Sequence, residues 1–153
     1  MTKKSILITG CSSGIGLAAA MERGWRVFAS CKQQLDCDRL RTMDFESSRM
    51  DYTDTASLHR GLNEVLEATG GTLDVLFNNG AHAIPGAVED LPTDALRTIF
   101  EANFFGWHEV TRSILPVMRA QAKHGSSNVL PCLALLLSLG AVHTWPQNSH
   151  SKT

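Results

Sequence analysis

The chain has 153 residues, of which 43% are hydrophobic and 19% charged, so its composition excludes a disordered chain and suits one globular core. Its formal net charge of −1 at pH 7 provides no basic surface for nucleic acid, which makes a small-molecule partner the better expectation. The 4 cysteines show no C-x-x-C pairing, and we predict no metal site and reduced thiols in a cytoplasmic protein.

Apolar segments alternate with amphipathic ones along the chain. Strands are predicted over residues 5–9, 25–30, 46–50 and 73–77, and helices over residues 14–23, 55–69 and 96–121. Such alternation predicts right-handed β-α-β crossovers and a parallel sheet covered on both faces. The apolar stretch at 129–142 contains Pro131 and Gly140 and is shorter than the ~20 residues of a spanning helix, so we predict no membrane segment.

The turn between the first strand and the first helix contains three spaced glycines. Gly10 permits a sharp turn, Gly14 brings the backbone close to a pyrophosphate, and Gly16 allows the helix to pack tightly on the sheet. This pattern predicts a dinucleotide at the N-terminal part of the chain, although an ordinary Gly-rich turn is the alternative. The predicted fold is therefore α/β, a Rossmann-type doubly wound parallel sheet with helices on both faces, incomplete at its C-terminal end. Few residues separate Gly16 from Gly24, so the first helix is expected to be short. The shortness reflects either a real deletion or a sequence error.

Four motifs in chain order resemble the short-chain dehydrogenase/reductase family. They are the Thr-Gly-Cys-Ser-Ser-Gly-Ile-Gly loop of residues 9–16, the acidic turn that begins at Asp51, the Asn-Asn turn within residues 73–81, and the helical segment of residues 101–106. In the Asn-Asn turn, the family has Ala-Gly where this chain has Gly-Ala. The resemblance covers residues 1–123 and implies an NAD(P)-binding domain there, with residues 124–153 as an atypical tail.

The resemblance also implies roles for individual residues. Cofactor-binding roles fall on Thr9, Gly10, Ser12, Ser13, Gly14, Ile15, Gly16, Asp51, Tyr52, Asn78, Asn79, Gly80 and Ala81, and a catalytic role on Asn103. For the two asparagines of the turn, simple turn formation is the alternative, because Asn tolerates left-handed backbone. The resemblance further implies a homo-oligomer built through the helix of residues 96–121. Its residues Phe100, Phe104, Phe105 and Trp107 fit either that face or core packing.

The end of the second strand bears on the choice of cofactor. A carboxylate there would bind a ribose 2′-hydroxyl and repel a 2′-phosphate, but this chain has Lys32 and no acid. We therefore predict NADP in preference to NAD, with Lys32 as a cofactor-binding residue. A solvated surface lysine is the alternative.

The family's acid/base pair is missing from the sequence as written. Family members transfer hydride between nicotinamide and an alcohol or carbonyl carbon with a tyrosine and a lysine four residues later. Tyr52 is the single tyrosine here and is followed by Ala56 at that spacing. In the neighbouring reading frame, residues 143–148 are compatible with Tyr-x-x-x-Lys, so we interpret the tail as a mistranslated or truncated active-site region.

Three functions remain open at this stage. The first is an oxidoreductase for a small alcohol or ketone, hydrophobic by analogy with the family's steroid and retinol members, whose sequence is shifted here. The second is a catalytically inactive nucleotide-binding fragment. The third is an unrelated Rossmann-type binding module, which the segment around Asn103 disfavours.

Overall fold

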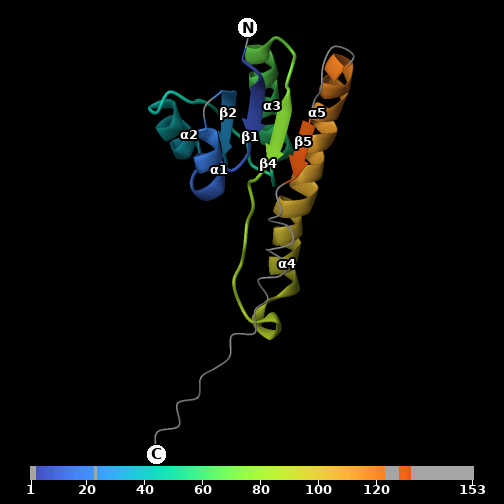
Figure 1. Ribbon diagram of the computed structural model, residues 1–153. Coiled ribbons are helices and arrows are strands. Elements are labelled where there is room, and N and C mark those ends of the chain that lie inside the picture. The colour runs from blue at the N-terminus through green and yellow to red at the C-terminus, as the bar shows by residue number, and fades with distance from the viewer. Residues whose placement is uncertain (1–2, 23, 123–127, 132–153) are drawn as a thin grey trace, which may run out of the picture.

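A parallel β-sheet forms the centre of the molecule in the computed structural model, which describes residues 3–22, 24–122 and 128–131 (Figure 1). Within these residues the sheet has five strands in the order β3-β2-β1-β4-β5. The strands are β1 Ser5–Ile8, β2 Arg26–Cys31, β3 Glu46–Arg49, β4 Val75–Asn78 and β5 Asn128–Pro131. The strand order reverses where β1 pairs with both β2 and β4, which makes their carboxyl ends the topological switch point of the sheet.

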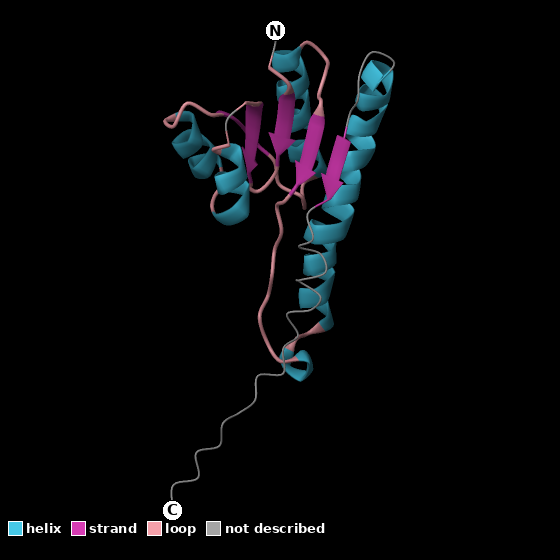
Figure 2. Ribbon diagram, viewed as in Figure 1, coloured by secondary structure: helices cyan, strands magenta, loops and turns pink. Residues whose placement is uncertain are grey.

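The helices lie between successive strands and on both faces of the sheet (Figure 2). They are α1 Gly14–Ala20, α2 Gln34–Arg41, α3 Thr55–Thr69, α4 Thr93–Phe100 and α5 Trp107–Ala122, with a 3-10 turn at Val88–Asp90 and a π-helical turn at Glu101–Gly106. The last two α-helices and the π turn form one long rod, which agrees with the predicted helix over 96–121 and extends beyond the carboxyl edge of the sheet (Figure 1).

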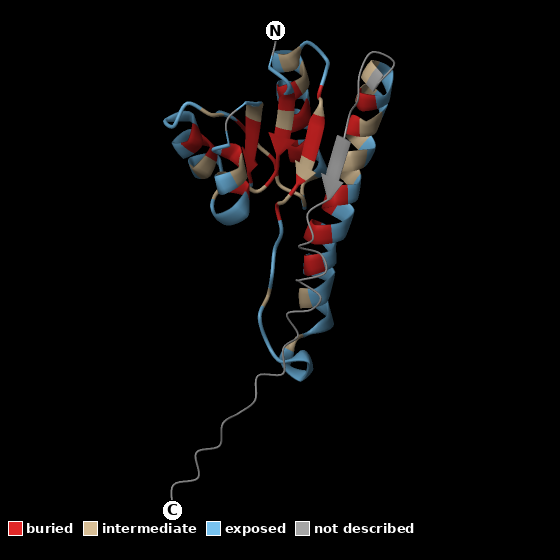
Figure 3. Cartoon of the chain, in the orientation of Figure 1, coloured by how far each residue is buried: buried red, intermediate tan, exposed pale blue. Residues whose placement is uncertain are grey.

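Two separate apolar clusters hold the helices to the sheet (Figure 3). Alternate residues of β1 point to opposite faces, so Leu7 packs with the α3 and α5 side chains, whereas Ile8 packs with those of α1 and α2. The predicted parallel sheet with helices on both faces is therefore confirmed. The first helix is indeed short, with 7 residues in α1.

Helix α2 is an element that the sequence analysis failed to predict. Only Cys37 and Leu40 of this helix are buried, while Leu35 is 81% exposed. A stripe of two apolar residues is too narrow to give the pattern of an amphipathic helix. The helix forms because the tertiary fold provides a buried surface for those two side chains.

Strand β5 lies in the segment that the sequence analysis described only as an atypical tail. Residues 128–131 pair in parallel register with β4, from Val75 opposite Asn128 to Asn78 opposite Pro131. Backbone pairing requires an extended chain rather than a particular side chain, and a proline is tolerated at a sheet edge. The rest of the tail, including Cys132 and the residues compatible with Tyr-x-x-x-Lys, lies outside the described residues.

Helix α3 has clear signals at both ends. Its N-cap Asp54 accepts a hydrogen bond from Ser57 N at 3.0 Å, and Gly70 ends the helix in the left-handed conformation with a φ of +68°. These two caps explain why the predicted bounds of this helix, 55–69, agree with the structure.

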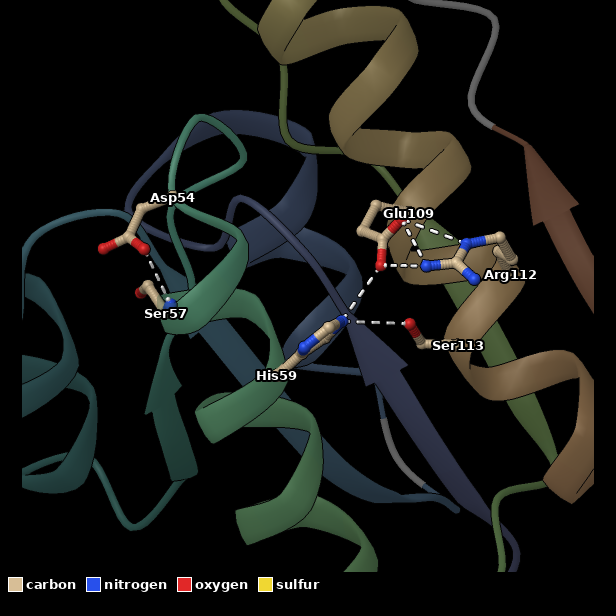
Figure 4. A network of polar contacts seen from close by, with 6 residues as sticks. All are labelled: Asp54, Ser57, His59, Glu109, Arg112 and Ser113. Atoms are coloured by element: carbon tan, nitrogen blue, oxygen red, sulfur yellow. Dashed lines mark hydrogen bonds and ion pairs between the residues drawn. The ribbon is translucent and has the colours of Figure 1, made fainter.

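A surface cluster of polar side chains joins α3 to α5 (Figure 4). Glu109 Oε1 lies 2.9 Å from His59 Nε2 and 2.7 Å from Arg112 Nη2, and Ser113 Oγ lies 3.4 Å from the same histidine nitrogen. Hydrogen bonds from Arg112 and His59 lower the pKa of Glu109 to about 2. The cluster is exposed, so we interpret it as a surface link between the two helices.

Candidate functional site: a cleft at the switch point of the sheet

The loop between β1 and α1 touches the turn after β4 at the switch point. Gly10 has a φ of +70°, and a Cβ atom at this position would stand 2.3 Å from the Cα of Gly80. Gly16 is equally confined, since its Cβ would lie 2.4 Å from both Asn79 Nδ2 and Gly10 O. No side chain fits at either glycine, so the close approach of the two loops requires both.

Asn79 fixes this approach with its side chain. Its amide Nδ2 donates to Thr9 O at 3.0 Å and to Gly10 O at 3.1 Å. The third loop glycine, Gly14, differs from the other two because no atom lies within 4 Å of a Cβ built there, although its φ is +59°. Open space beside Gly14 is what the approach of a ligand to the start of α1 requires.

A cleft of about 360 Å³ opens at the carboxyl ends of β1, β2 and β4. Its lining includes most of the residues that the sequence analysis assigned to the cofactor: Thr9, Gly10, Ser12, Ser13, Lys32, Asp51, Tyr52, Asn79, Gly80 and Ala81. It also includes Ser30, Met50, Thr53, His82, Thr98 and Ala102, which the sequence analysis did not assign. These residues reach the cleft only through the fold, and no spacing in the sequence identifies them.

One end of the cleft is rich in charge. Lys32 Nζ lies 3.7 Å from Asp51 Oδ1, and Arg49 Nε donates to Lys32 O at 3.0 Å. Arg39 of α2 donates from Nη2 to the carbonyl of Ser12, in the glycine loop. The missed helix α2 therefore brings a guanidinium group to the loop.

Asp51 is ionised in this environment. Partial burial opposes the charge, but hydrogen bonds from the N–H and hydroxyl of Thr53 and the nearby charges of Lys32 and Arg49 outweigh it, and the pKa of Asp51 is lowered. Its carboxylate is thus a hydrogen-bond acceptor at neutral pH, with a cation beside it.

Tyr52 lines the cleft and is partly buried. Its hydroxyl donates a hydrogen bond to Thr9 Oγ1 at 2.5 Å. Burial raises its pKa further above that of ordinary tyrosine, so the phenol stays protonated. The same Thr9 oxygen accepts from the backbone N–H of Asn79 at 2.9 Å and of Gly80 at 3.2 Å.

Asn103 occupies the π-helical turn and is fully buried. Its Oδ1 accepts from His82 N at 2.7 Å, and its Nδ2 donates to His82 O at 2.7 Å. This two-bond pairing ties the long helix to the loop after β4. The side-chain amide therefore acts on the backbone of the loop, and a π turn is a common way of directing a helical side chain to such a place.

Other predicted site residues lie outside the lining of the cleft. Asn78 is buried, and its Nδ2 donates to Thr111 Oγ1 of α5 at 2.9 Å, while its Oδ1 has no hydrogen-bond partner among the described residues. Ile15 is 68% exposed on α1.

The four aromatic residues of the long helix divide into two groups. Trp107 is buried and its Nε1 donates to Gly80 O at 2.6 Å, so core packing describes this residue. Phe100, Phe104 and Phe105 are exposed, by 41%, 48% and 53%. Core packing therefore applies to Trp107, while the three exposed phenylalanines leave the oligomer face as a prediction.

The three described cysteines cluster beneath the glycine loop. Cys11, Cys31 and Cys37 are free thiols and are buried between the sheet and helices α1 and α2. Burial raises the pKa of Cys11 and of Cys31 to about 12, so both are protonated near neutral pH.

Comparisons with known proteins agree with the fold and the glycine loop described above. The short chain dehydrogenase profile matches residues 4–129. This chain belongs to the short-chain dehydrogenase family. Among curated relatives, it is 36% identical over 131 residues to the uncharacterized oxidoreductase YbbO of Escherichia coli K12, covering 84% of this chain and 48% of that protein. The chain thus spans about half the length of such relatives.

Solved structures of family members bind either nicotinamide cofactor. An NADH-dependent reductase, A1-R′, complexed with NAD is 29% identical, with a TM-score of 0.72 over 85% of this chain and 59% of that one. A variant actinorhodin polyketide ketoreductase with NADPH is 25% identical, with a TM-score of 0.71 over 84% and 52%. These likenesses support an NAD(P)-binding Rossmann fold and an oxidoreductase family, whose members act on small-molecule substrates.

None of the helices in the described part is long and apolar enough to cross a membrane. In the same part of the chain, no group of three or more His, Cys, Asp or Glu side chains is arranged to hold a metal ion.

Proposed function

We propose that the cleft binds NADP in preference to NAD and that the protein is a short-chain oxidoreductase domain. The observation that carries this proposal is the presence of the glycine loop and Lys32 on one cleft. The Ser12 and Ser13 hydroxyls line it, and the space beside Gly14 is open, so these residues fit a pyrophosphate. When bound, the nicotinamide would supply the hydride acceptor or donor.

Lys32 supports the preference for the phosphorylated cofactor. It directly follows β2, at a position where an acid would repel a 2′-phosphate, and its ammonium lies near the ionised Asp51. A 2′-phosphate carries more negative charge than the single carboxylate of Asp51, so it would compete with Asp51 for the ammonium group of Lys32. Arg39 and Arg49 add positive charge to the same end of the cleft.

Titration of the chain with NADPH and NADH, followed by nicotinamide fluorescence, tests the proposal. We expect tighter binding of NADPH, and a loss of about tenfold in NADPH affinity in Lys32→Ala with little change for NADH. Lys4→Ala is the matched control, because Lys4 is an exposed lysine that precedes β1 and is absent from the cleft lining. Equal affinity for the two cofactors, or an equal loss in the control, would contradict the proposal.

We also propose that this chain by itself binds cofactor without turnover, because its sequence lacks the Tyr-x-x-x-Lys pair. The substrate class that we propose for the complete enzyme is a hydrophobic alcohol or ketone, and the proposed location is the cytoplasm. The nucleotide sequence across codons 115–153 separates the alternatives. A single-base shift that restores the pair would identify an oxidoreductase, whereas an intact frame would favour an inactive nucleotide-binding protein.

The exposed aromatic face of the long helix carries a proposal on assembly. Phe100, Phe104 and Phe105 form an apolar surface, with Phe104 and Phe105 in edge-to-face contact at 5.4 Å between ring centroids. We propose this face as the contact between copies of the family domain, since neighbouring exposed aromatic residues favour protein association.

A further inference from the structure

The ring of Tyr52 fills the space next to Gly80. A Cβ atom built on Gly80 would stand 2.8 Å from Tyr52 Cε2, 3.1 Å from the Tyr52 hydroxyl oxygen and 3.2 Å from Gly10 N, so the tyrosine makes the two shortest of these contacts. Real Cβ atoms essentially never approach another heavy atom to 2.8 Å. A side chain at position 80 would have to displace this partly buried ring, so the position favours glycine even over alanine.

The opposite side of the tyrosine is just as confined. A Cβ on Gly106, the last residue of the π turn, would lie 2.5 Å from Tyr52 Cβ and 2.9 Å from Tyr52 O. The tyrosine is therefore held between two glycines, one from the turn after β4 and one from the long helix. Neither Tyr52 nor the turn can shift without disturbing the other.

Hydrogen bonds hold both backbone polar groups of Gly80. Thr9 Oγ1 accepts from the N–H of Gly80 and from the Tyr52 hydroxyl, and Trp107 Nε1 donates to the Gly80 carbonyl. The ring thus packs against a turn in which the N–H and C=O groups of Gly80 already have hydrogen-bond partners. Gly80 and Ala81 both line the cleft, so a displacement of this turn changes the shape of the cleft.

We propose that Tyr52 is a positioning residue of the cleft and that Tyr52 and Gly80 form a size-matched pair. Tyrosine at position 52 requires glycine at position 80, and a smaller residue at 52 permits alanine at 80. The cofactor part of the inference rests on the proposed function, but the packing part does not.

A double-mutant cycle tests the pair in the full chain. The variants are Tyr52→Val, Gly80→Ala and the double variant, each measured for its urea unfolding midpoint and for its NADPH dissociation constant. We expect Gly80→Ala to lower the midpoint and to weaken NADPH binding about tenfold, and the double variant to recover most of both losses. If Gly80→Ala alone fails to fold, folding of the double variant is itself the expected rescue.

Two further variants identify the cause. In Tyr52→Phe the ring remains and the hydroxyl is lost, so we expect the Gly80→Ala penalty to persist in that background. Gly86→Ala is the matched control, since its nearest contacts are to Leu91, and its effect should be additive with Tyr52→Val.

Additive effects of Tyr52→Val and Gly80→Ala would overturn the pairing. Recovery of the unfolding midpoint without recovery of the dissociation constant would leave a purely structural contact and would overturn the positioning role. Failure of the unaltered chain to bind NADPH would instead refute the proposed function and, with it, the positioning role, while the unfolding midpoints would still decide the pairing.

Discussion

The two sides of the cleft are held in different ways. On the β1–α1 side, the backbone is confined by glycines that leave no room for a side chain, and buried thiols pack beneath it. On the opposite side, the loop after β4 is held by side chains that reach it from elsewhere, namely Asn103 and Trp107. The first side is built from one continuous motif, whereas the second depends on contacts between distant residues.

This difference explains why one side is easy to recognise in a sequence and the other is not. The glycine loop occupies residues 9–16, so its pattern is visible within one short segment, even though Asn79 and Gly80 are among the residues that confine Gly10 and Gly16. Asn103 acts on His82, which is 21 residues away, and Trp107 acts on Gly80, which is 27 residues away. A contact across such a distance exists only once the long helix packs against the sheet.

The largest expected effect comes from breaking the contact that joins the two sides. Gly10→Ala combines a left-handed φ with a clash against Gly80, so we expect a loss of at least about 3 kcal/mol in the free energy of unfolding. Gly14→Ala is the matched control, since it shares the left-handed φ but meets open space, and should cost only about 1 kcal/mol. Urea unfolding compares the two, and equal losses would argue against the contact.

Asn103→Ala tests the second side alone. It leaves the N–H and C=O of His82 without their partner, and we expect a loss of about 2–3 kcal/mol, with proteolysis in the loop after β4. The thiol of Cys11, whose pKa burial raises to about 12, should remain as slow to alkylate as in the unaltered chain. Fast labelling of Cys11 would mean that the two sides are not independently held.

A smaller effect is expected from the surface cluster that joins α3 to α5. The pKa of Glu109, lowered to about 2 by Arg112 and His59, means that the native state favours the ionised form. The stabilisation is therefore present above the ordinary pKa of 4.5 and is lost as the pH falls toward about 2. Urea midpoints of Glu109→Gln should fall less steeply across this pH range than those of the unaltered chain, and parallel profiles would contradict the assignment.

The smallest effect on stability is expected at the exposed aromatic face. Phe104→Ser should change the free energy of unfolding by no more than about 0.5 kcal/mol, because the ring is half exposed. Trp107→Phe, in the same rod but buried, should cost about 1 kcal/mol through loss of its bond to Gly80. In sedimentation experiments, Phe104→Ser should weaken self-association, and an unchanged sedimentation profile would oppose the proposed contact face.

The order of the main strands and helices, the parallel sheet and the glycine loop were all predictable from the amino-acid sequence. These features depend on local patterns: apolar runs, the caps of α3, and three glycines in one turn. The sequence shows these patterns directly, because each of them lies within a few consecutive residues.

Other features depend on how distant parts of the chain pack together. Helix α2 forms around Cys37 and Leu40 because the sheet offers them a buried surface, and Asn78 faces α5 rather than the cleft. Tyr52, predicted as a cofactor-binding residue, lines the cleft and also packs between Gly80 and Gly106. The reason is that burial and close packing depend on contacts between residues that are far apart in the sequence. Such contacts leave no local sequence pattern.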